Sequence, residues 1–323
     1  MKAIVCTQYG PPELLQFTEV AKPVPADNEV LVKLYAAAVN PLDRFFMRSA
    51  PLIRLIPGMR KPKDPRMGVD LAGQVEAVGR NVTQFKPGDE VFGAGRGAFA
   101  EYVCVPEDKL TLKPANLSFE EAAAVPVAAL TALQGFRDKG QIQPGHRVLI
   151  DGASGGVGTF AIQIAKSFGA EVTAVCSTRN VERARALGAD HVIDYKQEDF
   201  TKNGQRYDLI MGANAHRSFF DYWRLLTQNG TYVVLGGGLP QILGGMLLAP
   251  LLSRMGSKKA RFFIADLNQK DLIVLRELLE ARKIVPVIDR RYALGQAADA
   301  IRYLEEGHAQ GKIVITIAHN EDA

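Results

Sequence analysis

A short glycine-rich segment near the middle of the chain has the spacing of a site that holds phosphate groups. Residues 153–158 read Ala-Ser-Gly-Gly-Val-Gly, which matches the pattern G-x-G-x-x-G with alanine in the first place. The apolar run 148–150 predicts a strand before this segment, and residues 159–166 predict a helix after it. A turn without large side chains lets the backbone approach a pyrophosphate, and the free N–H groups of the new helix point at the negative charge. Because glycine-rich turns also occur as plain tight turns, the dinucleotide interpretation depends on this context. The residues expected to contact the dinucleotide are Ser154, Gly155, Gly156 and Val157.

A second segment tests that interpretation and indicates which dinucleotide is bound. The strand-like run 171–176 ends about twenty residues after the loop, where a dinucleotide fold places the residue that reads the ribose. An NAD site would have Asp or Glu there, but this chain has Ser177, Thr178 and Arg179. A carboxylate would repel a 2′-phosphate, whereas two hydroxyls and a guanidinium would bind it. We therefore expect NADPH as the cofactor. The alternative is that Ser177 or Thr178 only caps the helix predicted over 181–187.

The same alternation of strands and helices continues along the second half of the chain. Further strands are predicted at 191–193, 207–211, 231–235 and 261–264, with a helix over 217–227 that stops at Asn229-Gly230. This alternation predicts a parallel sheet covered on both faces, with ligands beyond the strand ends. Four more residues are therefore expected at the cofactor edge: Tyr195, Asn214, Gly236 and Gly237. Tyr195 could equally be a half-buried surface residue, and the glycines could form only a flexible loop.

Composition excludes several classes of protein. The chain has 323 residues, which favours two domains, and 47% hydrophobic with 23% charged residues is ordinary for a globular protein. A net charge of +4, without a basic block that contains aromatics, gives no argument for nucleic acid. The three cysteines are far apart in strand-like runs, which favours core positions over disulfides or a metal cluster. The N-terminus goes straight into a strand pattern without a signal peptide, so we expect a cytoplasmic protein.

The first part of the chain has a different pattern. Up to about residue 118, short alternating runs are separated by turn clusters such as Lys86-Pro87-Gly88-Asp89, which predicts a β-rich, barrel-like domain. A helix is then predicted from residue 119, with Ser118 as N-cap and Glu121 at the capping-box position.

A series of further motifs runs along nearly the whole chain: 37–43, 68–73, 78–79, 85–93, 97–102, 129–132, the glycine loop, 176–180, 187–190 and 311–314. In these motifs and in their order the chain resembles a known family, the medium-chain dehydrogenases/reductases of the zinc-independent NADPH:quinone oxidoreductase branch. It is similar to the mitochondrial and chloroplast quinone oxidoreductase homologues. The resemblance implies an α/β fold, in which a GroES-like β-rich domain (1–118 and 266–323) is interrupted by a Rossmann doubly wound parallel sheet (119–265). It also implies a homodimer.

Departures from the zinc-dependent relatives bear on the chemistry. Asn40 stands where those relatives have Cys, and Val69 and Asp70 stand where they have His and Glu. Zinc prefers thiolate and imidazole ligands, so we expect no metal. The resemblance then favours reduction of a small hydrophobic quinone or α,β-unsaturated carbonyl. Hydride from NADPH would leave negative charge on the acceptor oxygen, and the Asn40 amide is the best side-chain donor for it. Asp43 either orients Asn40 or caps the following helix.

Three further assignments leave alternatives open. Thr131 is similar in position to a family residue that faces the nicotinamide, but a buried structural threonine fits as well. Lys312 reaches toward the cofactor or is a solvated lysine before the last strand. Residues 239–252 are too short and too interrupted to span a membrane, and they form a buried helix, a substrate mouth, a subunit contact or a lipid contact. The competing class of function is a non-catalytic NADPH-binding sensor or interaction protein, because it would keep the same cofactor loop.

Overall fold

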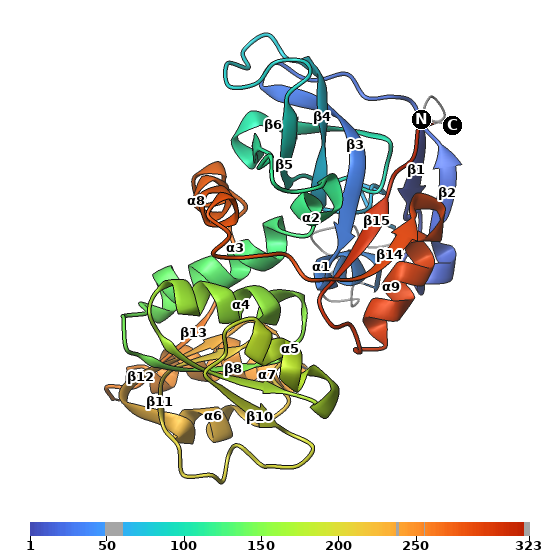
Figure 1. The fold of residues 1–323 in the computed structure, drawn as a ribbon. Helices are drawn as coiled ribbons and strands as arrows, with labels where there is room; N and C mark the ends of the chain where they lie inside the picture. The colour runs from blue at the N-terminus through green and yellow to red at the C-terminus, as the bar shows by residue number, and fades with distance from the viewer. Residues whose placement is uncertain (49–60, 237–238, 255, 320–323) are drawn as a thin grey trace. The chain divides into compact units, whose positions relative to one another are not determined.

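The computed structural model describes residues 1–48, 61–236, 239–254 and 256–319, which form two compact units (Figure 1). Unit 1 contains Met1–Val127, Leu267–Glu280 and Pro286–Ala323, and unit 2 contains Ala128–Asp266 and Ala281–Val285. The first break therefore falls after Val127 and not after residue 118. The reason is that helix α2 (Phe119–Ala123) packs on strands β3 and β4 of unit 1.

Unit 1 is built on a mostly antiparallel seven-stranded sheet, as the alternating runs predict. Strand β6 pairs with β3, and the other strands follow the order β14-β15-β3-β4-β5-β7, in which only β14 and β15 are parallel. The strands are β3 (Glu29–Val39), β4 (Asp70–Val78), β5 (Glu90–Ala94), β6 (Tyr102–Pro106), β7 (Leu110–Leu112), β14 (Ile288–Ala293) and β15 (Lys312–Thr316). A separate antiparallel pair is formed by β1 (Lys2–Val5) and β2 (Gln16–Glu19).

Unit 1 contains four helices in the described part of the chain, and α2 begins at the predicted signal. They are α1 (Pro41–Arg48), α2, α8 (Gln269–Glu280) and α9 (Ala297–Glu305), with 3₁₀ turns η1 (Pro12–Leu14), η3 (Glu107–Lys109) and η6 (Leu294–Gln296). The capping box predicted for α2 is confirmed: Ser118 Oγ accepts from the Glu121 N–H at 3.2 Å, and a Glu121 carboxylate oxygen accepts from the Ser118 N–H at 2.8 Å. Helix α8 buries Leu272, Leu275 and Leu279 along one face.

The core of unit 1 joins residues from both ends of the chain. Alternate side chains of β3, such as Val32 and Leu34, pack in one cluster with Ile313 and Ile315 of β15 and with Ile301 of α9. Strand β15 is hydrogen-bonded between β14 and β3, so the C-terminal segment completes the sheet begun near the N-terminus.

Unit 2 is a parallel sheet with the strand order β10-β9-β8-β11-β12-β13. Counted from its first strand this order is 3-2-1-4-5-6, the doubly wound order of dinucleotide-binding sheets. The strands are β8 (Arg147–Asp151), β9 (Glu171–Cys176), β10 (His191–Asp194), β11 (Tyr207–Gly212), β12 (Leu226–Val234) and β13 (Lys259–Phe262). The predicted α/β architecture is thus confirmed.

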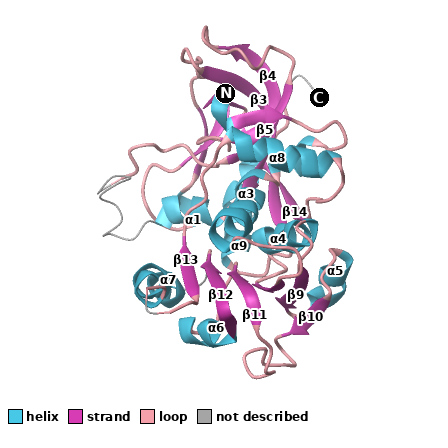
Figure 2. Cartoon of the chain, turned by 90° about the vertical axis from the view of Figure 1, so that its left-hand side faces the viewer, coloured by secondary structure: helices cyan, strands magenta, loops and turns pink. Residues whose placement is uncertain are grey.

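Helices connect these strands on both faces of the sheet. Figure 2 shows α4 on one side of the strands and α6 on the other, as right-handed crossovers on each side of β8 and β11 require. The helical segments are α3 (Pro126–Gln134), which begins in unit 1, the π-helical η4 (Gly135–Gly140), α4 (Gly156–Ser167), η5 (Thr178–Asn180), α5 (Val181–Ala186), α6 (Phe219–Leu225) and α7 (Leu239–Leu252).

The structure corrects two predicted boundaries in unit 2. The helix expected over 217–227 is α6, which ends at Leu225, and β12 begins at once and runs through Asn229-Gly230. Leu226 pairs with Tyr207, and the Thr227 hydroxyl donates to the Asp208 carboxylate at 3.0 Å. These two residues are therefore part of the sheet and not of the helix. The last strand begins at residue 259 and ends at 262, two residues earlier than expected.

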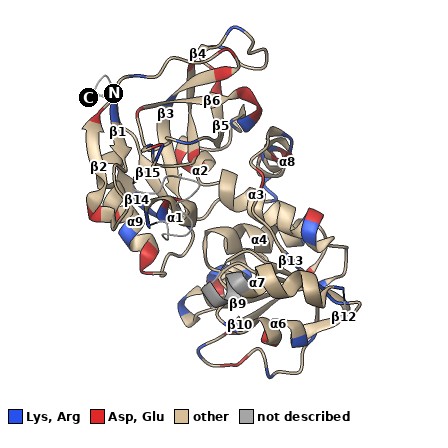
Figure 3. Cartoon of the chain, turned by 180° about the vertical axis from the view of Figure 1, so that it is seen from behind, with Lys and Arg blue, Asp and Glu red and all other residues tan. Residues whose placement is uncertain are grey.

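Helix α7 is not a fully buried helix. It has no charged residue, yet Met246, Leu247 and Leu251 are 53%, 69% and 56% exposed, while Ala249 is buried. In Figure 3, α7 accordingly carries neither a blue nor a red segment. Within the described ranges, no helix combines the length and the hydropathy needed to cross a bilayer.

Candidate active site and dinucleotide edge

The carboxyl ends of the unit 2 strands meet at one edge of the sheet. Asp151 at the end of β8 is level with Gly212 at the end of β11, and the strand order reverses between these two strands. Such a switch point is where open α/β sheets bind ligands, because the loops diverge there. The backbone carbonyl of Asp151 accepts from the Ala213 N–H at 3.0 Å, which ties the loop after β11 to the start of the glycine-rich loop.

The glycine-rich loop has the close backbone packing that a dinucleotide site needs. Gly152 has φ +80°, a conformation that glycine adopts without strain. A Cβ on Gly158 would lie 2.2 Å from the Gly152 carbonyl oxygen and 2.6 Å from the Ala153 Cα, so only glycine fits where α4 packs on the turn. A Cβ on Gly155, by contrast, would meet the Gly152 carbonyl oxygen at 3.6 Å, an ordinary contact.

Helix α4 begins directly behind this loop, with Gly155 as its N-cap and no side chain bonded across the cap. The first N–H groups of α4 are therefore available to an anion, and the helix dipole favours negative charge at this point. The four residues predicted to contact the dinucleotide, Ser154 to Val157, are all partly exposed here. This local structure fits the pyrophosphate of a dinucleotide.

A buried acid–phenol pair lies directly before the glycine-rich loop, and sequence reasoning missed it. The Asp151 carboxylate accepts a hydrogen bond from the Tyr222 hydroxyl, whose ring stacks on Tyr232 with centroids 4.8 Å apart. Burial raises the pKa of Asp151, while the Tyr222 hydroxyl, the nearby His216 and the Gly152 N–H oppose that rise. Burial and the Asp151 charge raise the pKa of Tyr222. The signal in the sequence is an acid directly after the apolar run 148–150, because a buried carboxyl needs a partner inside the fold.

The segment after β9 is organised around Ser177, which is buried. The Asn180 amide donates to Ser177 Oγ at 3.1 Å, and Thr178 and Arg179 are exposed at the tip. The N-cap residue of α5 is Asn180, without a side-chain cap bond, so the alternative that Ser177 or Thr178 only caps this helix is wrong. Thr178 instead begins the 3₁₀ turn η5 directly beyond the end of β9, and Ser177 is the N-cap residue of that turn, without a side-chain cap bond.

A carboxylate that sequence reasoning missed lies at the same edge. Asp194 ends β10 in register with Cys176, the residue before Ser177. The Thr178 hydroxyl and the Lys196 N–H lower the pKa of Asp194, so this carboxyl is ionised at neutral pH. Its charge opposes phosphate binding, and Arg179 supplies the opposite charge. Tyr195 follows, 48% exposed, with its N–H bonded to the Cys176 carbonyl at 3.1 Å.

The other predicted cofactor residues also lie beyond strand ends of unit 2. Asn214 is exposed, and a Cβ on Gly152 would lie 2.7 Å from its backbone nitrogen. The Gly236 N–H bonds the Gly212 carbonyl at 3.1 Å, and a Cβ on Gly236 would lie 2.7 Å from the Ala213 carbonyl oxygen. Gly237 lies outside the described residues. Every described cofactor residue predicted within unit 2 therefore lies at the carboxyl edge of its sheet.

The remaining predicted residues belong elsewhere, and two of them meet in the interior of unit 1. Lys312 Nζ donates to Asn40 Oδ1 at 2.7 Å and to Asp70 Oδ2 at 3.0 Å, and Asn40 Nδ2 donates to Asp70 Oδ2 at 2.9 Å. These three side chains are 3% exposed or less. The alternative of a solvated Lys312 is therefore wrong: Lys312 is the first residue of β15 and its ammonium is enclosed.

Asp70 is the residue that sequence reasoning missed in this cluster. Its second carboxylate oxygen accepts from the Val127 N–H at 2.9 Å, in the first turn of α3. The carboxylate thus binds a lysine, an amide and a helix N-terminus at once, which satisfies a buried charge. Thr131 lies half-buried on the next turn of the same helix.

The Asn40 amide is fully engaged in this arrangement. Its second Nδ2 hydrogen bonds the Ala38 carbonyl at 3.2 Å, so donation to an acceptor oxygen requires that this weaker bond be exchanged. Asp43 fixes the backbone of Asn40, because Asp43 Oδ2 accepts from the Asn40 N–H at 2.7 Å just before α1 begins. This is one of the two bonds of a capping box, since the Asp43 N–H donates to the Asn40 backbone carbonyl at 3.0 Å and not to its side chain.

The residues of this cluster do not fit a zinc ion. Asn40 offers an amide and Val69 no donor, and Asp70 already carries the Lys312 ammonium as its counter-ion. A divalent cation would have to displace that ammonium without gaining a thiolate or imidazole ligand. Among the described residues, no group of three His, Cys, Asp or Glu side chains has a metal-binding arrangement.

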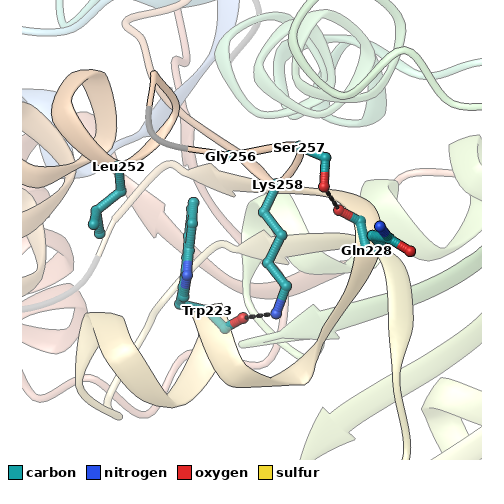
Figure 4. A pocket seen from close by; sticks show the side chains of 6 residues that line it. All are labelled: Trp223, Gln228, Leu252, Gly256, Ser257 and Lys258. Carbon is teal, nitrogen blue, oxygen red and sulfur yellow. Dashed lines mark hydrogen bonds between the residues drawn. The ribbon is translucent and has the colours of Figure 1, made fainter.

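A pocket of about 300 Å³ lies near the amino ends of β12 and β13, opposite to the carboxyl edge (Figure 4). Its polar groups bond to its own walls: Lys258 Nζ donates to the Trp223 carbonyl at 2.9 Å, and the Ser257 hydroxyl donates to the Gln228 carbonyl. It contains none of the predicted site residues, and it is not the dinucleotide site.

Comparisons with known proteins show which family the chain resembles. A family model described as "Alcohol dehydrogenase GroES-like domain" matches residues 26–115, and one described as "Zinc-binding dehydrogenase" matches residues 187–315. The human "NAD(P)H oxidoreductase RTN4IP1, mitochondrial" is 36% identical over 98% of this chain and 89% of its own length. The "2-methylene-furan-3-one reductase" of Solanum lycopersicum is also 36% identical, over 98% of this chain and 79% of its own. The solved Escherichia coli quinone oxidoreductase complexed with NADPH superposes with a TM-score of 0.82 at 27% identity, covering 98% of this chain and 100% of that one.

Proposed function

Because this chain belongs to the medium-chain dehydrogenase/reductase superfamily, in its quinone oxidoreductase-like branch, we propose that it reduces a quinone or an α,β-unsaturated carbonyl with NADPH. That it is an NAD(P)H-dependent oxidoreductase follows from the family. The finer statement is supported by one observation above all: an open glycine loop and helix start at the carboxyl edge of unit 2, next to Arg179 and without a ribose-reading acid at the end of β9.

For the cofactor, each part of the edge has a proposed task. The N–H groups at the start of α4 hold the pyrophosphate, and Gly155 lets it approach. Ser177, Thr178 and Arg179 take the 2′-phosphate, with the Arg179 guanidinium outweighing the Asp194 carboxylate. Tyr195 and Asn214 flank the adenosine end, and Gly236 leaves room for the nicotinamide. When bound, the reduced nicotinamide supplies the hydride.

For the acceptor, we propose that the Asn40 amide donates a hydrogen bond to the oxygen that gains negative charge. Its Nδ2 would exchange the 3.2 Å bond to the Ala38 carbonyl for a bond to the acceptor oxygen, and keep the 2.9 Å bond to Asp70. Lys312 and Asp70 hold the amide in one orientation, so donation involves little reorganisation. Thr131 is the second residue proposed at the reaction centre. The proton that completes the reduction comes from water.

Relatives support both acceptor classes: the Escherichia coli protein is a quinone oxidoreductase, and the Solanum lycopersicum protein is a 2-methylene-furan-3-one reductase. A carbonyl conjugated to a double bond or a second carbonyl accepts hydride without a Lewis acid. This matches a cluster whose cation is an ammonium bound to Asp70 and Asn40, so we propose a small hydrophobic quinone or enone as substrate.

A homodimer is proposed as the assembly. Strand β13 is at the edge of its sheet, and an unpaired strand edge is a site for pairing with another chain. Helix α7, which packs beside β13, exposes Met246, Leu247 and Leu251. Large exposed apolar side chains that lie together mark contact surfaces. A cytoplasmic location stays a prediction from the sequence, and named relatives are mitochondrial or chloroplastic.

The test of the proposed function is turnover. Purified protein is mixed with NADPH and a panel of quinones and enones, and NADPH absorbance is followed, with NADH as the matched control. We expect oxidation of NADPH by at least one acceptor class and slower oxidation of NADH. No oxidation with any acceptor, together with tight NADPH binding, would instead support a non-catalytic NADPH-binding protein.

A further inference from the structure

The buried polar cluster of unit 1, formed by Asn40, Asp43, Asp70 and Lys312, contains two carboxyl groups but only one ammonium. Asp70 and Lys312 form a salt bridge at 3.0 Å and compensate each other. Asp43 is fully buried beside them, so its ionised form leaves the cluster with a net negative charge. Asp43 Oδ2 accepts from the Asn40 N–H, and Oδ1 makes no hydrogen bond of ordinary geometry in the described part of the chain. A buried carboxylate oxygen without such a hydrogen bond disfavours the ionised form.

From this geometry we propose that Asp43 is a positioning residue for the proposed reaction, whose charge acts on Asn40 and is itself controlled by Asp70 and Lys312. The inference rests on the proposed function, because Asn40 is the residue assigned to the acceptor oxygen. Nothing in the comparisons assigns a role to Asp43.

The charges around Asp43 account for its behaviour. Burial is the largest effect and raises the pKa of Asp43, and the Asp70 carboxylate on β4 raises it further, while the Asn40 N–H, the Lys312 ammonium on β15 and the Gly68 N–H lower it. The result is a pKa of about 7, so the carboxyl changes charge near neutral pH. Asp70 and Lys312 are the charged side chains that act on it.

Ionisation of Asp43 affects Asn40 in two ways. Ionised Asp43 binds the Asn40 N–H more strongly, because a hydrogen bond to a charged acceptor is stronger than one to a neutral acid. Ionised Asp43 also attracts the Lys312 ammonium and weakens its 2.7 Å bond to Asn40 Oδ1. The protonated form therefore keeps the amide locked between Lys312 and Asp70, and turnover falls as pH rises through neutrality.

Two variants should move this transition in opposite directions. Asp70→Asn removes the repelling carboxylate, so Lys312 turns to Asp43 and the inflection in the pH profile of kcat moves to lower pH. Lys312→Met removes the attracting ammonium, so the inflection moves to higher pH. A residue with a purely structural role would not give shifts of opposite sign. Asp43→Asn, which keeps the shape and the acceptor for the Asn40 N–H, should remove the inflection.

The experiment measures kcat and KM against pH for the full-length protein with NADPH, and follows aspartate carboxyl resonances by NMR in the same four proteins. We expect a carboxyl that titrates near neutrality, is absent from Asp43→Asn, and shifts with the inflection. An unchanged inflection in Asp43→Asn, or shifts of the same sign in the other two variants, overturns the inference. The carboxyl titration is read without turnover, so an inactive wild-type protein refutes the proposed function, whereas an active one with a profile insensitive to Asp43→Asn refutes only this inference.

Discussion

Two glycines of the same loop should respond to an added methyl group in different ways. Gly158→Ala places a Cβ 2.2 Å from the Gly152 carbonyl oxygen and 2.6 Å from the Ala153 Cα, both backbone atoms that cannot turn away. Gly155→Ala places its Cβ 3.6 Å from the same carbonyl oxygen, at φ −78°, which alanine adopts without strain. The first substitution therefore tests packing of α4 against the turn, and the second tests the approach of the ligand.

The size of each effect follows from these contacts. Overpacking against the backbone lowers the free energy of unfolding by about 3 kcal/mol, the upper part of the usual range. The higher helix propensity of alanine offsets about 1 kcal/mol of this loss. Gly158→Ala should thus lose about 2 kcal/mol, which corresponds to about 4–8 °C in Tm for a domain of this class. Gly155→Ala should change stability by no more than about 0.5 kcal/mol. It should weaken NADPH binding by roughly tenfold, or about 1.4 kcal/mol, because the methyl group holds the pyrophosphate away from the N–H groups.

Thermal unfolding without ligand and fluorescence titration with NADPH separate the two effects. Gly158→Ala serves as the stability variant and Gly155→Ala as its matched control, since both add one methyl group to one loop. Equal losses of Tm in the two variants would refute the assignment of separate tasks. A Gly158→Ala protein as stable as the wild type would show that the turn and α4 are not packed as described.

Three other outcomes are expected. Arg179→Glu should raise the Kd for NADPH at least about tenfold and leave that for NADH within about twofold, because it reverses the charge that opposes Asp194; equal changes for both nucleotides in calorimetry would contradict the 2′-phosphate assignment. The pKa of Asp43 in the folded protein lies above its unfolded value, so its ionisation costs stability as pH rises from the unfolded pKa to about 7. The free energy of unfolding of Asp43→Asn in urea, taken relative to the wild type, should therefore be about 2–3 kcal/mol higher at pH 8 than at pH 5. A difference between variant and wild type that does not depend on pH would contradict the raised pKa of Asp43. The double variant Leu247→Ser/Leu251→Ser should shift sedimentation toward the monomer, whereas the control Val274→Ser, at an exposed apolar position on α8, should not; if the double variant sediments as the wild type does, α7 is not the contact.

The order of elements in unit 2 was predictable because each signal is local. The strand before the glycine loop, the helix behind it and the alternation that follows are written in consecutive residues, and they lead directly to a parallel sheet with its ligand edge at Gly155. The end of α6 was not predictable in this way. Leu226 and Thr227 are compatible with a helix, but the pairing of Leu226 with Tyr207 depends on a strand that lies earlier in the chain.

The cluster around Asn40 shows where reasoning from motifs stops. Asn40, Asp43 and Lys312 each attract attention singly, yet their contacts depend on β15 lying beside β3, a pairing between opposite ends of the chain. Asp70 was noted only as a departure from a zinc-ligand motif, although a charged residue at the start of the run Asp70–Val78 must find a partner when that strand is buried. Asp194 was missed because its effect depends on lateral register with Cys176.

The late position of β15 has a consequence during synthesis on the ribosome. Strand β3 is complete at residue 39, but its neighbour on one side is made only when residue 316 has been translated. At about 5–20 residues per second, this edge of β3 stays unpaired for on the order of 15–60 s before β15 is made. Unit 2 needs little from the last forty residues and can fold meanwhile, so the nascent chain presents a finished nucleotide-binding domain tethered to an unfinished sheet. Chaperone capture and misassembly should therefore concentrate on the N-terminal half of the nascent polypeptide.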